Sequence, residues 1–113
     1  MSERRRRNPT QIRYELLMAA LPGGRKTHIM YESGLNLKQL NFYMNELTSS
    51  GALEFRGLEK KYYATVKGRT FLRAYDHYRE LVNLLNKQEN ILTEFFRSPT
   101  KPETEGQSFA VRF

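Results

Sequence analysis

The sequence contains no cysteine, and this absence excludes two classes of structure. Without thiols the chain can form neither a disulfide framework nor a thiolate metal site, and a reducing compartment suits it. It also has no apolar run near the ~18 residues that a membrane span needs. The opening segment MSERRRR is not followed by the apolar stretch of a secretory signal. We therefore expect a cytoplasmic protein.

Residues suited to catalysis are scarce as well. The two histidines, His28 and His77, fall on different predicted elements, and neither has a cysteine or a paired carboxylate at metal-site or general-base spacing. Gly23 and Gly24 lack the strand and the lysine-serine pair of a phosphate-binding loop. The sequence therefore predicts neither an enzyme nor a cofactor, and no small-molecule substrate is evident.

Positive charge is in excess and unevenly distributed. The 113 residues suffice for one small core and one extra element, with 39% apolar and 27% charged residues, as in folded soluble proteins. Nineteen Lys and Arg against twelve Asp and Glu give +7, and residues 1–30 alone carry 7 − 2 = +5. This concentration favours a polyanion as partner, although a solubilising surface explains it equally well.

Three helices are predicted before any strand. Residues 1–8 form a flexible basic arm, in which Asn8 is suited to the N-cap of a helix that begins at Pro9. Apolar residues at helical spacing continue this helix to a Pro-Gly-Gly turn. A short second helix follows, with Thr27 as its cap and Gly34 as its end.

The third helix begins at Leu37 and ends near Gly51, and Asn36 and Gln39 before and within it form a capping-box pattern. A projection at 100° per residue separates a core face from an outer face. The predicted core face consists of Leu37, Leu40, Tyr43, Met44 and Leu47. The predicted outer face consists of Lys38, Gln39, Asn41, Phe42, Asn45, Glu46 and Ser49.

Two short apolar segments, residues 53–55 and 62–64, flank a turn around Gly57 and predict a small β-hairpin. The fold class is therefore mainly α with a small β-hairpin. The order of three helices and a hairpin predicts a winged helix-turn-helix domain over residues 9–66.

A long helix is predicted over residues 67–96, with Thr65 as its N-cap. Its apolar residues recur in a 4-3 rhythm that Glu89 interrupts, which is typical of a coiled coil and predicts a homodimer. The alternative is a helix that folds back on its own domain. The predicted dimer contacts are Tyr75, Tyr78, Leu81, Val82, Leu85, Leu92, Phe95 and Phe96. Residues 97–113 are Pro-rich and polar at first and predict a disordered tail.

The segments KTHIMYESGLNLKQLNFYMNELTSSGALEF and YYATVKGRTFL resemble the archaeal winged helix-turn-helix family, over residues 10–95. The likeness is greatest to the small dimeric chromatin-type DNA-binding proteins of that family, which carry a long C-terminal helix. The resemblance implies two winged helices joined by an antiparallel coiled coil, in a dimer that binds double-stranded DNA. This sequence has Asn41 and Phe42 where family members tend to carry basic residues. Its most specific matching pieces are Thr27 with Ile29-Met30-Tyr31, Gln39-Leu40, Tyr43, Gly51 and Lys67-Gly68.

In a helix-turn-helix the second paired helix lies in the major groove, so the helix from Leu37 would face base edges. Asn41 and Asn45 match the donor and acceptor pair of adenine, and Phe42 could contact a thymine methyl. The helix has no arginine, so we expect weak base discrimination. Phosphate contacts are expected from the arm, the second helix N-terminus and the wing. The predicted DNA-binding residues are Arg4, Arg5, Arg6, Arg7, Arg25, Lys26, Thr27, His28, Asn36, Lys38, Gln39, Asn41, Phe42, Asn45, Arg56, Lys60 and Lys61.

These patterns predict a dimeric protein that binds double-stranded DNA at the nucleoid, as a transcriptional regulator or an architectural chromatin protein. A rival interpretation is a protein-interaction adaptor, in which Phe42 docks a protein and the coiled coil assembles a complex. An RNA-binding role lacks the stacking aromatics expected on a sheet surface.

Overall fold

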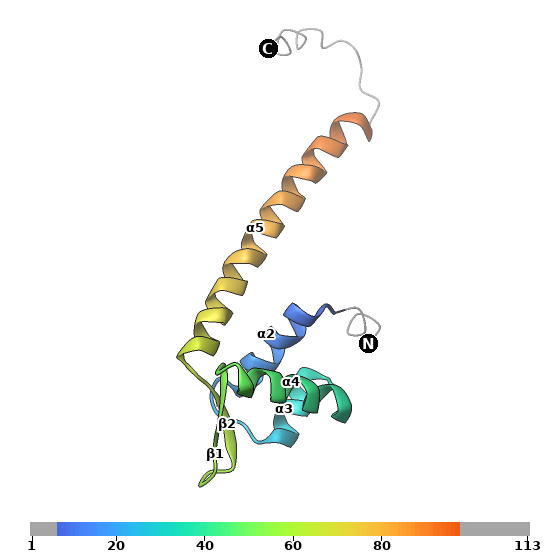
Figure 1. Cartoon of the computed structure of the whole chain (residues 1–113). Coiled ribbons are helices and arrows are strands. Elements are labelled where there is room, and N and C mark those ends of the chain that lie inside the picture. Colours follow the sequence, from blue (N-terminus) through green and yellow to red (C-terminus); the bar gives the residue numbers. More distant parts are fainter. Residues whose placement is uncertain (1–6, 98–113) are drawn as a thin grey trace, which may run out of the picture. The chain divides into compact units, whose positions relative to one another are not determined.

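A computed structural model describes residues 7–97 of the chain. The elements follow in the order α2 (Pro9–Ala20), α3 (Lys26–Ser33), α4 (Leu37–Ser49), β1 (Leu53–Arg56), β2 (Lys61–Ala64) and α5 (Val66–Arg97) (Figure 1). This order confirms the predicted fold class, mainly helical with one hairpin and a long last helix. The predicted basic side chains Arg4, Arg5 and Arg6 and residues 98–113 of the predicted tail lie outside the described residues. Arg97, with which the tail was predicted to begin, is instead the last residue of α5.

The chain divides into two compact units, Met1–Tyr78 and Arg79–Phe113, and the boundary falls within α5. The first turns of α5 belong to the first unit because Leu72 is buried in its core and Tyr75 packs on Tyr14 of α2, with ring centroids 4.6 Å apart. The hydroxyl of Tyr14 also donates a hydrogen bond of 2.8 Å to Asp76. None of the helices within residues 7–97 is long and apolar enough to cross a membrane.

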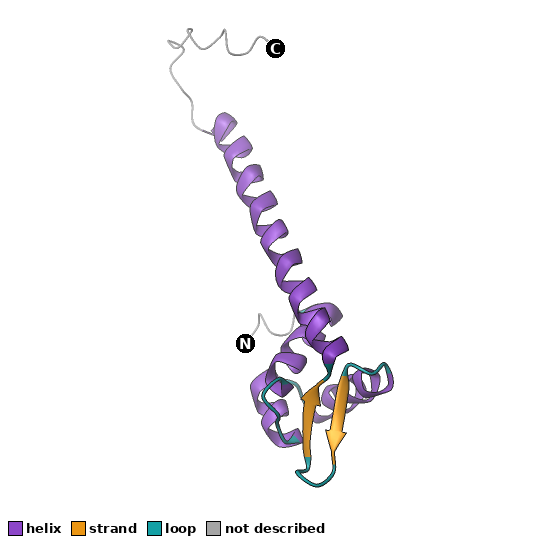
Figure 2. Ribbon diagram, turned by 90° about the vertical axis from the view of Figure 1, so that its left-hand side faces the viewer, coloured by secondary structure: helices purple, strands orange, loops and turns teal. Residues whose placement is uncertain are grey.

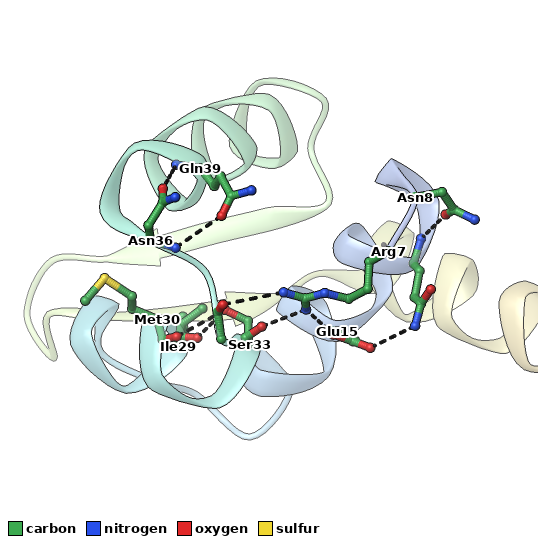
Figure 3. Close-up of polar contacts among 10 residues, drawn as sticks. Arg7, Asn8, Glu15, Ile29, Met30, Ser33, Asn36 and Gln39 are labelled. Carbon is green, nitrogen blue, oxygen red and sulfur yellow. Dashed lines mark hydrogen bonds and ion pairs between the residues drawn. The ribbon is translucent and has the colours of Figure 1, made fainter. Parts of the chain in front are cut away.

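Local capping signals set the helix ends as predicted. Asn8 caps α2 by accepting a hydrogen bond of 2.8 Å from the amide of Gln11. At the start of α4, Asn36 Oδ1 accepts from the amide of Gln39 at 2.8 Å, and Gln39 Oε1 accepts from the amide of Asn36 at 3.2 Å (Figure 3). Gly34 ends α3 in the left-handed conformation, with φ of 69°.

The predicted cap of the second helix was wrong. This helix, α3, begins at Lys26, and Arg25 occupies the N-cap position without any side-chain cap hydrogen bond. The reason lies outside the helix, because Gly24 pairs with Tyr62 of β2 as an antiparallel bridge. The bridge is followed directly by Arg25 in extended backbone, so the helix starts one residue before Thr27.

The core of the first unit is aliphatic and is supplied by all three short helices. Leu16 and Leu17 of α2, Ile29 of α3 and Leu40 of α4 are fully buried. One predicted core residue was wrong, because Leu37 is 58% exposed. It is the first residue of α4, and Leu35 in the preceding loop is buried instead. Of the predicted face, Leu40, Met44 and Leu47 are buried, and Tyr43 packs against the core while partly exposed.

The hairpin is antiparallel, with Leu53 opposite Ala64 and Arg56 opposite Lys61. Its turn projects beyond the three short helices in both views (Figures 1 and 2). Within the turn the left-handed residue is Lys60, with φ of 56°, and not Gly57. A non-glycine residue in this conformation is uncommon, although short-range strain of this kind is tolerated in turns.

The start of α5 packs closely against Ala52, the residue that precedes β1. Thr65 caps the helix, since its Oγ1 accepts from the amide of Gly68 at 3.1 Å, and its own amide donates to the carbonyl of Ala52 at 3.0 Å. A Cβ on Gly68 would lie 2.4 Å from that same carbonyl oxygen. Glycine is therefore required at residue 68 by a close approach of two backbones.

We predict that Gly68→Ala destabilises the fold by about 1–3 kcal/mol, because neither backbone can yield without disturbing the hairpin or the start of α5. Thermal unfolding followed by circular dichroism measures the effect. The control is Gly57→Ala, where the new Cβ would meet only a ring carbon of Phe55, at 4.0 Å. Equal melting temperatures for the two variants would contradict the tight contact.

Candidate nucleic-acid interface

A hollow of about 500 Å³ lies between the N-terminus of α3 and strand β2. It brings together residues that the sequence assigned separately to the second helix and to the wing. Arg25 and Lys61 carry positive charge, and the side chains of Thr27 and His28 are exposed at the helix start. We call this the α3 hollow. The residues that line it are Gly23, Gly24, Arg25, Thr27, His28, Tyr31 and Lys61.

Backbone pairing explains why Lys61 lies at the α3 hollow. The amide of Gly24 donates to the carbonyl of Tyr62 at 3.0 Å, and the amide of Tyr62 donates back to Gly24 at 2.8 Å. Gly23 beside this bridge has φ of 95°, and a Cβ there would lie 2.5 Å from the ring of Tyr63. Gly23 thus allows the loop before α3 to lie directly against the wing.

The hollow has the features of an anion site. The first amides of α3 have no partner within the helix, and Arg25 provides no side-chain cap for them. The partial positive charge of a helix N-terminus adds to the charges of Arg25 and Lys61. A phosphate oxygen placed here would accept hydrogen bonds from backbone and side chains together.

The outer face of α4 presents polar side chains and one aromatic ring. Lys38 and Asn45 are exposed, Asn41 is half-buried, and Phe42 is 62% exposed. The ring of Phe42 lies edge-on to Tyr43, with centroids 5.0 Å apart. This face therefore surrounds one apolar ring with hydrogen-bonding side chains.

Asn36 and Gln39 differ from the rest of the predicted interface because both take part in the capping box. Their side-chain oxygens each accept a backbone hydrogen bond. Each retains its amide NH₂ group as a donor. The NH₂ group can contact an acceptor, but the backbone bond leaves each oxygen only one lone pair for the donor of adenine.

The wing is less positive than its lysines and arginine imply. Arg56 Nε donates to Glu54 at 2.7 Å, and its guanidinium lies 4.0 Å from the centre of the Tyr63 ring. The hydroxyl of Tyr63 donates in turn to Glu59. These hydrogen bonds raise the pKa of Arg56 and the pKa of Tyr63 above their ordinary values. Both groups therefore keep their protons, and Glu54 offsets the charge of Arg56.

Arg7 does not belong to a flexible arm, and this prediction is corrected. Its side chain is only 5% exposed, and its guanidinium forms an ion pair with Glu15 of α2. The same group donates a hydrogen bond of 2.7 Å to the carbonyl of Ser33 at the end of α3 (Figure 3). A second, longer bond of 3.5 Å reaches the carbonyl of Gly34. Arg7 therefore joins α2 to the C-terminal end of α3.

Tyr31, like Gly23 and Gly24, lines the α3 hollow although sequence reasoning did not assign it to the interface. It is 82% exposed. The sequence could have placed Tyr31 beside Thr27 and His28, because residues 27, 28 and 31 lie on one face of a helix. A ring in this position can pack against a deoxyribose or a base.

Comparisons with known proteins agree with the fold. A family model described as winged helix-turn-helix matches residues 6–83. The crystal structure of Sso10a-2, a DNA-binding protein from Sulfolobus solfataricus, superposes with a TM-score of 0.73. The match covers 82% of this chain and 100% of that one at 21% sequence identity, so the likeness is one of fold. A search of curated protein sequences finds no significant match.

We predict that Arg7→Met lowers the stability of the fold by about 1–3 kcal/mol, because it leaves the carbonyl of Ser33 without its Arg7 donor and removes the cation that pairs with Glu15. Urea denaturation gives the free energy of unfolding. Arg73→Met is the matched control, since Arg73 is exposed on α5. If Arg7→Met is as stable as Arg73→Met, the contacts of Arg7 contribute nothing to the stability of the fold.

Proposed function

Since this chain belongs to the winged helix-turn-helix family, we propose that it binds double-stranded DNA through the α3 hollow and the outer face of α4. The observation that carries the proposal is the α3 hollow, where cations from two elements flank unpaired helix amides. The fold likeness to Sso10a-2, described as a DNA-binding protein, supports it.

The phosphate contacts supply most of the affinity. A phosphate in the α3 hollow meets Arg25, Lys61 and the first amides of α3, and Lys26 and Lys60 follow and precede these two cations in the sequence. Arg4, Arg5 and Arg6 add further phosphate or minor-groove contacts. With about six phosphates neutralised per protomer, log affinity falls with log salt at a slope near −5.

The base contacts are weak. Lys38, Asn41 and Asn45 face the major groove, and Phe42 contacts a thymine methyl. Because α4 carries no arginine, it lacks the commonest specific contact, the bidentate pair with guanine. This favours an architectural protein of the nucleoid over a regulator with a few operators, and no catalytic role is proposed.

The chain acts as a homodimer that is joined by α5. The apolar stripe of α5 is exposed along residues 78–96, apart from Val82, which is half-buried. An apolar stripe of this length on one helix needs a partner surface, even though Glu89 interrupts it. An antiparallel coiled coil between two copies would cover it and would let each dimer engage two DNA segments. The exposed large apolar side chains of this stripe are Tyr78, Leu81, Leu84, Leu85, Ile91, Leu92, Phe95 and Phe96.

We predict that Lys61→Met weakens binding to duplex DNA of any sequence and makes the salt slope shallower by about 0.9, the loss of one phosphate contact. Lys38→Met should also weaken binding, because it removes a contact of α4 in the major groove. Fluorescence anisotropy with a random-sequence duplex, between ~50 and ~200 mM salt, measures both quantities. The control is Lys87→Met, which removes the same charge from exposed α5.

Two results oppose the proposal. Affinities of both variants equal to that of the control would remove the α3 hollow and α4 from the interface. No binding by the wild type at micromolar concentration and ~50 mM salt would favour the adaptor function through Phe42, because non-specific DNA binding is strongest at low salt.

We predict that Leu85→Asp with Leu92→Asp produces monomers, since each protomer would have to bury two charges in the dimer contact. Sedimentation equilibrium measures the mass in solution. The matched control, Asn83→Asp with Asn90→Asp, adds the same charges to α5 outside the apolar stripe and should remain dimeric. A monomeric wild type would refute the dimer.

A further inference from the structure

A second cavity, of about 260 Å³, lies between α2, α4 and the first turn of α5. All of its lining residues belong to the first unit. Leu17, Leu47 and Ala52 form apolar walls from buried side chains, and Phe71 adds a partly exposed ring. Of the outer face of α4 only Glu46 lines it, and none of the proposed DNA-contact residues does, so the proposed DNA contacts do not explain the cavity.

Three charged side chains line the cavity, and their charges do not sum to zero. Arg13 and Glu46 neutralise each other through two hydrogen bonds of 2.9 Å. These bonds also raise the pKa of Arg13 and lower the pKa of Glu46, so both stay charged near neutral pH. Lys67 Nζ donates to the neutral carbonyl of Ser50 at 2.6 Å. The charged groups of the lining thus sum to +1, which is the charge of Lys67.

The neighbouring helix ends do not change this balance. The C-terminal end of α4 contributes Leu47 and Ser50 to the lining, and the N-terminal turn of α5 contributes Lys67. The partial charges at such ends are about −0.5 and +0.5 and oppose each other. An ammonium has three donors, so Lys67 can bind an anion while it keeps the bond to Ser50.

We propose that this cavity binds a small monocarboxylate with an apolar body, such as an aromatic acid, with its carboxylate on Lys67. The size agrees, because an apolar cavity of ~150 Å³ already holds a benzene ring. The apolar walls bury the body of the ligand, and the charge of Lys67 selects an anion over a neutral molecule. The site depends on the folded first unit alone and not on DNA binding.

Benzoate and benzamide are matched probes because they share the ring and differ in charge. We expect titration of the ¹⁵N-labelled full chain with benzoate, at constant ionic strength, to shift the amides of Leu47, Ser50, Ala52 and Lys67. Benzamide should bind about tenfold more weakly, since it lacks the charge-assisted bond. Lys67→Met should bring benzoate down to the benzamide level, whereas Lys87→Met should retain the difference.

A second variant keeps the test decisive if Lys67→Met fails to fold. Ser50→Trp places a large side chain at an exposed position of the lining and should abolish the binding of both probes. Equal binding of benzoate and benzamide would overturn the assignment of an anion. Benzoate shifts confined to the α3 hollow, or no shifts at all, would overturn the site. None of these results bears on duplex binding, which the anisotropy experiment tests independently.

Discussion

Two hydrogen bonds between Gly24 and Tyr62 connect the loop before α3 to the wing, and the candidate interface depends on them. They set the start of α3, because the extended backbone of the bridge leads directly into Arg25 as N-cap. They also bring strand β2, with Lys61, beside the free amides of that helix. A positive site formed by two segments far apart in the sequence follows from one pair of backbone bonds.

The cations of this fold fall into two groups, those that connect parts of the protein through ion pairs and those that can contact a partner. Arg7 and Arg13 each pair with a carboxylate of the same unit and connect helices to one another. Arg56 pairs with Glu54 on its own strand. Because these three arginines are neutralised locally, the positive charge of Arg25 and Lys61 at the α3 hollow is more distinct. Electrostatic attraction of a polyanion depends on such local excess more than on net charge.

Sequence reasoning predicted features that depend on neighbours within a few residues. The Asn36–Gln39 capping box and the glycine end of α3 at Gly34 are local signals, and both were confirmed. Features that depend on distant partners were wrong or missed. The burial of Arg7 requires Ser33, 26 residues later, and the start of α3 requires Tyr62. The exposure of Leu37 follows from the packing of Leu35, which helical periodicity does not include.

The same limit applies to the site. The second helix N-terminus and the wing were each recognised as basic, but a sequence does not show that they face one hollow. Nor does it show that Glu54 offsets Arg56, since cross-strand and same-strand pairs depend on rotamers. The cavity beside Lys67 combines three helices and had no local signal at all.

The proposed DNA binding depends on the α3 hollow as the site where a phosphate contacts this protein. A crystal structure of the full chain with a short DNA duplex tests this most directly. We expect a phosphate oxygen within hydrogen-bonding distance of the first amides of α3 and of Lys61, with the outer face of α4 in the adjacent major groove. A duplex bound at another surface, with the α3 hollow facing solvent, would contradict the account.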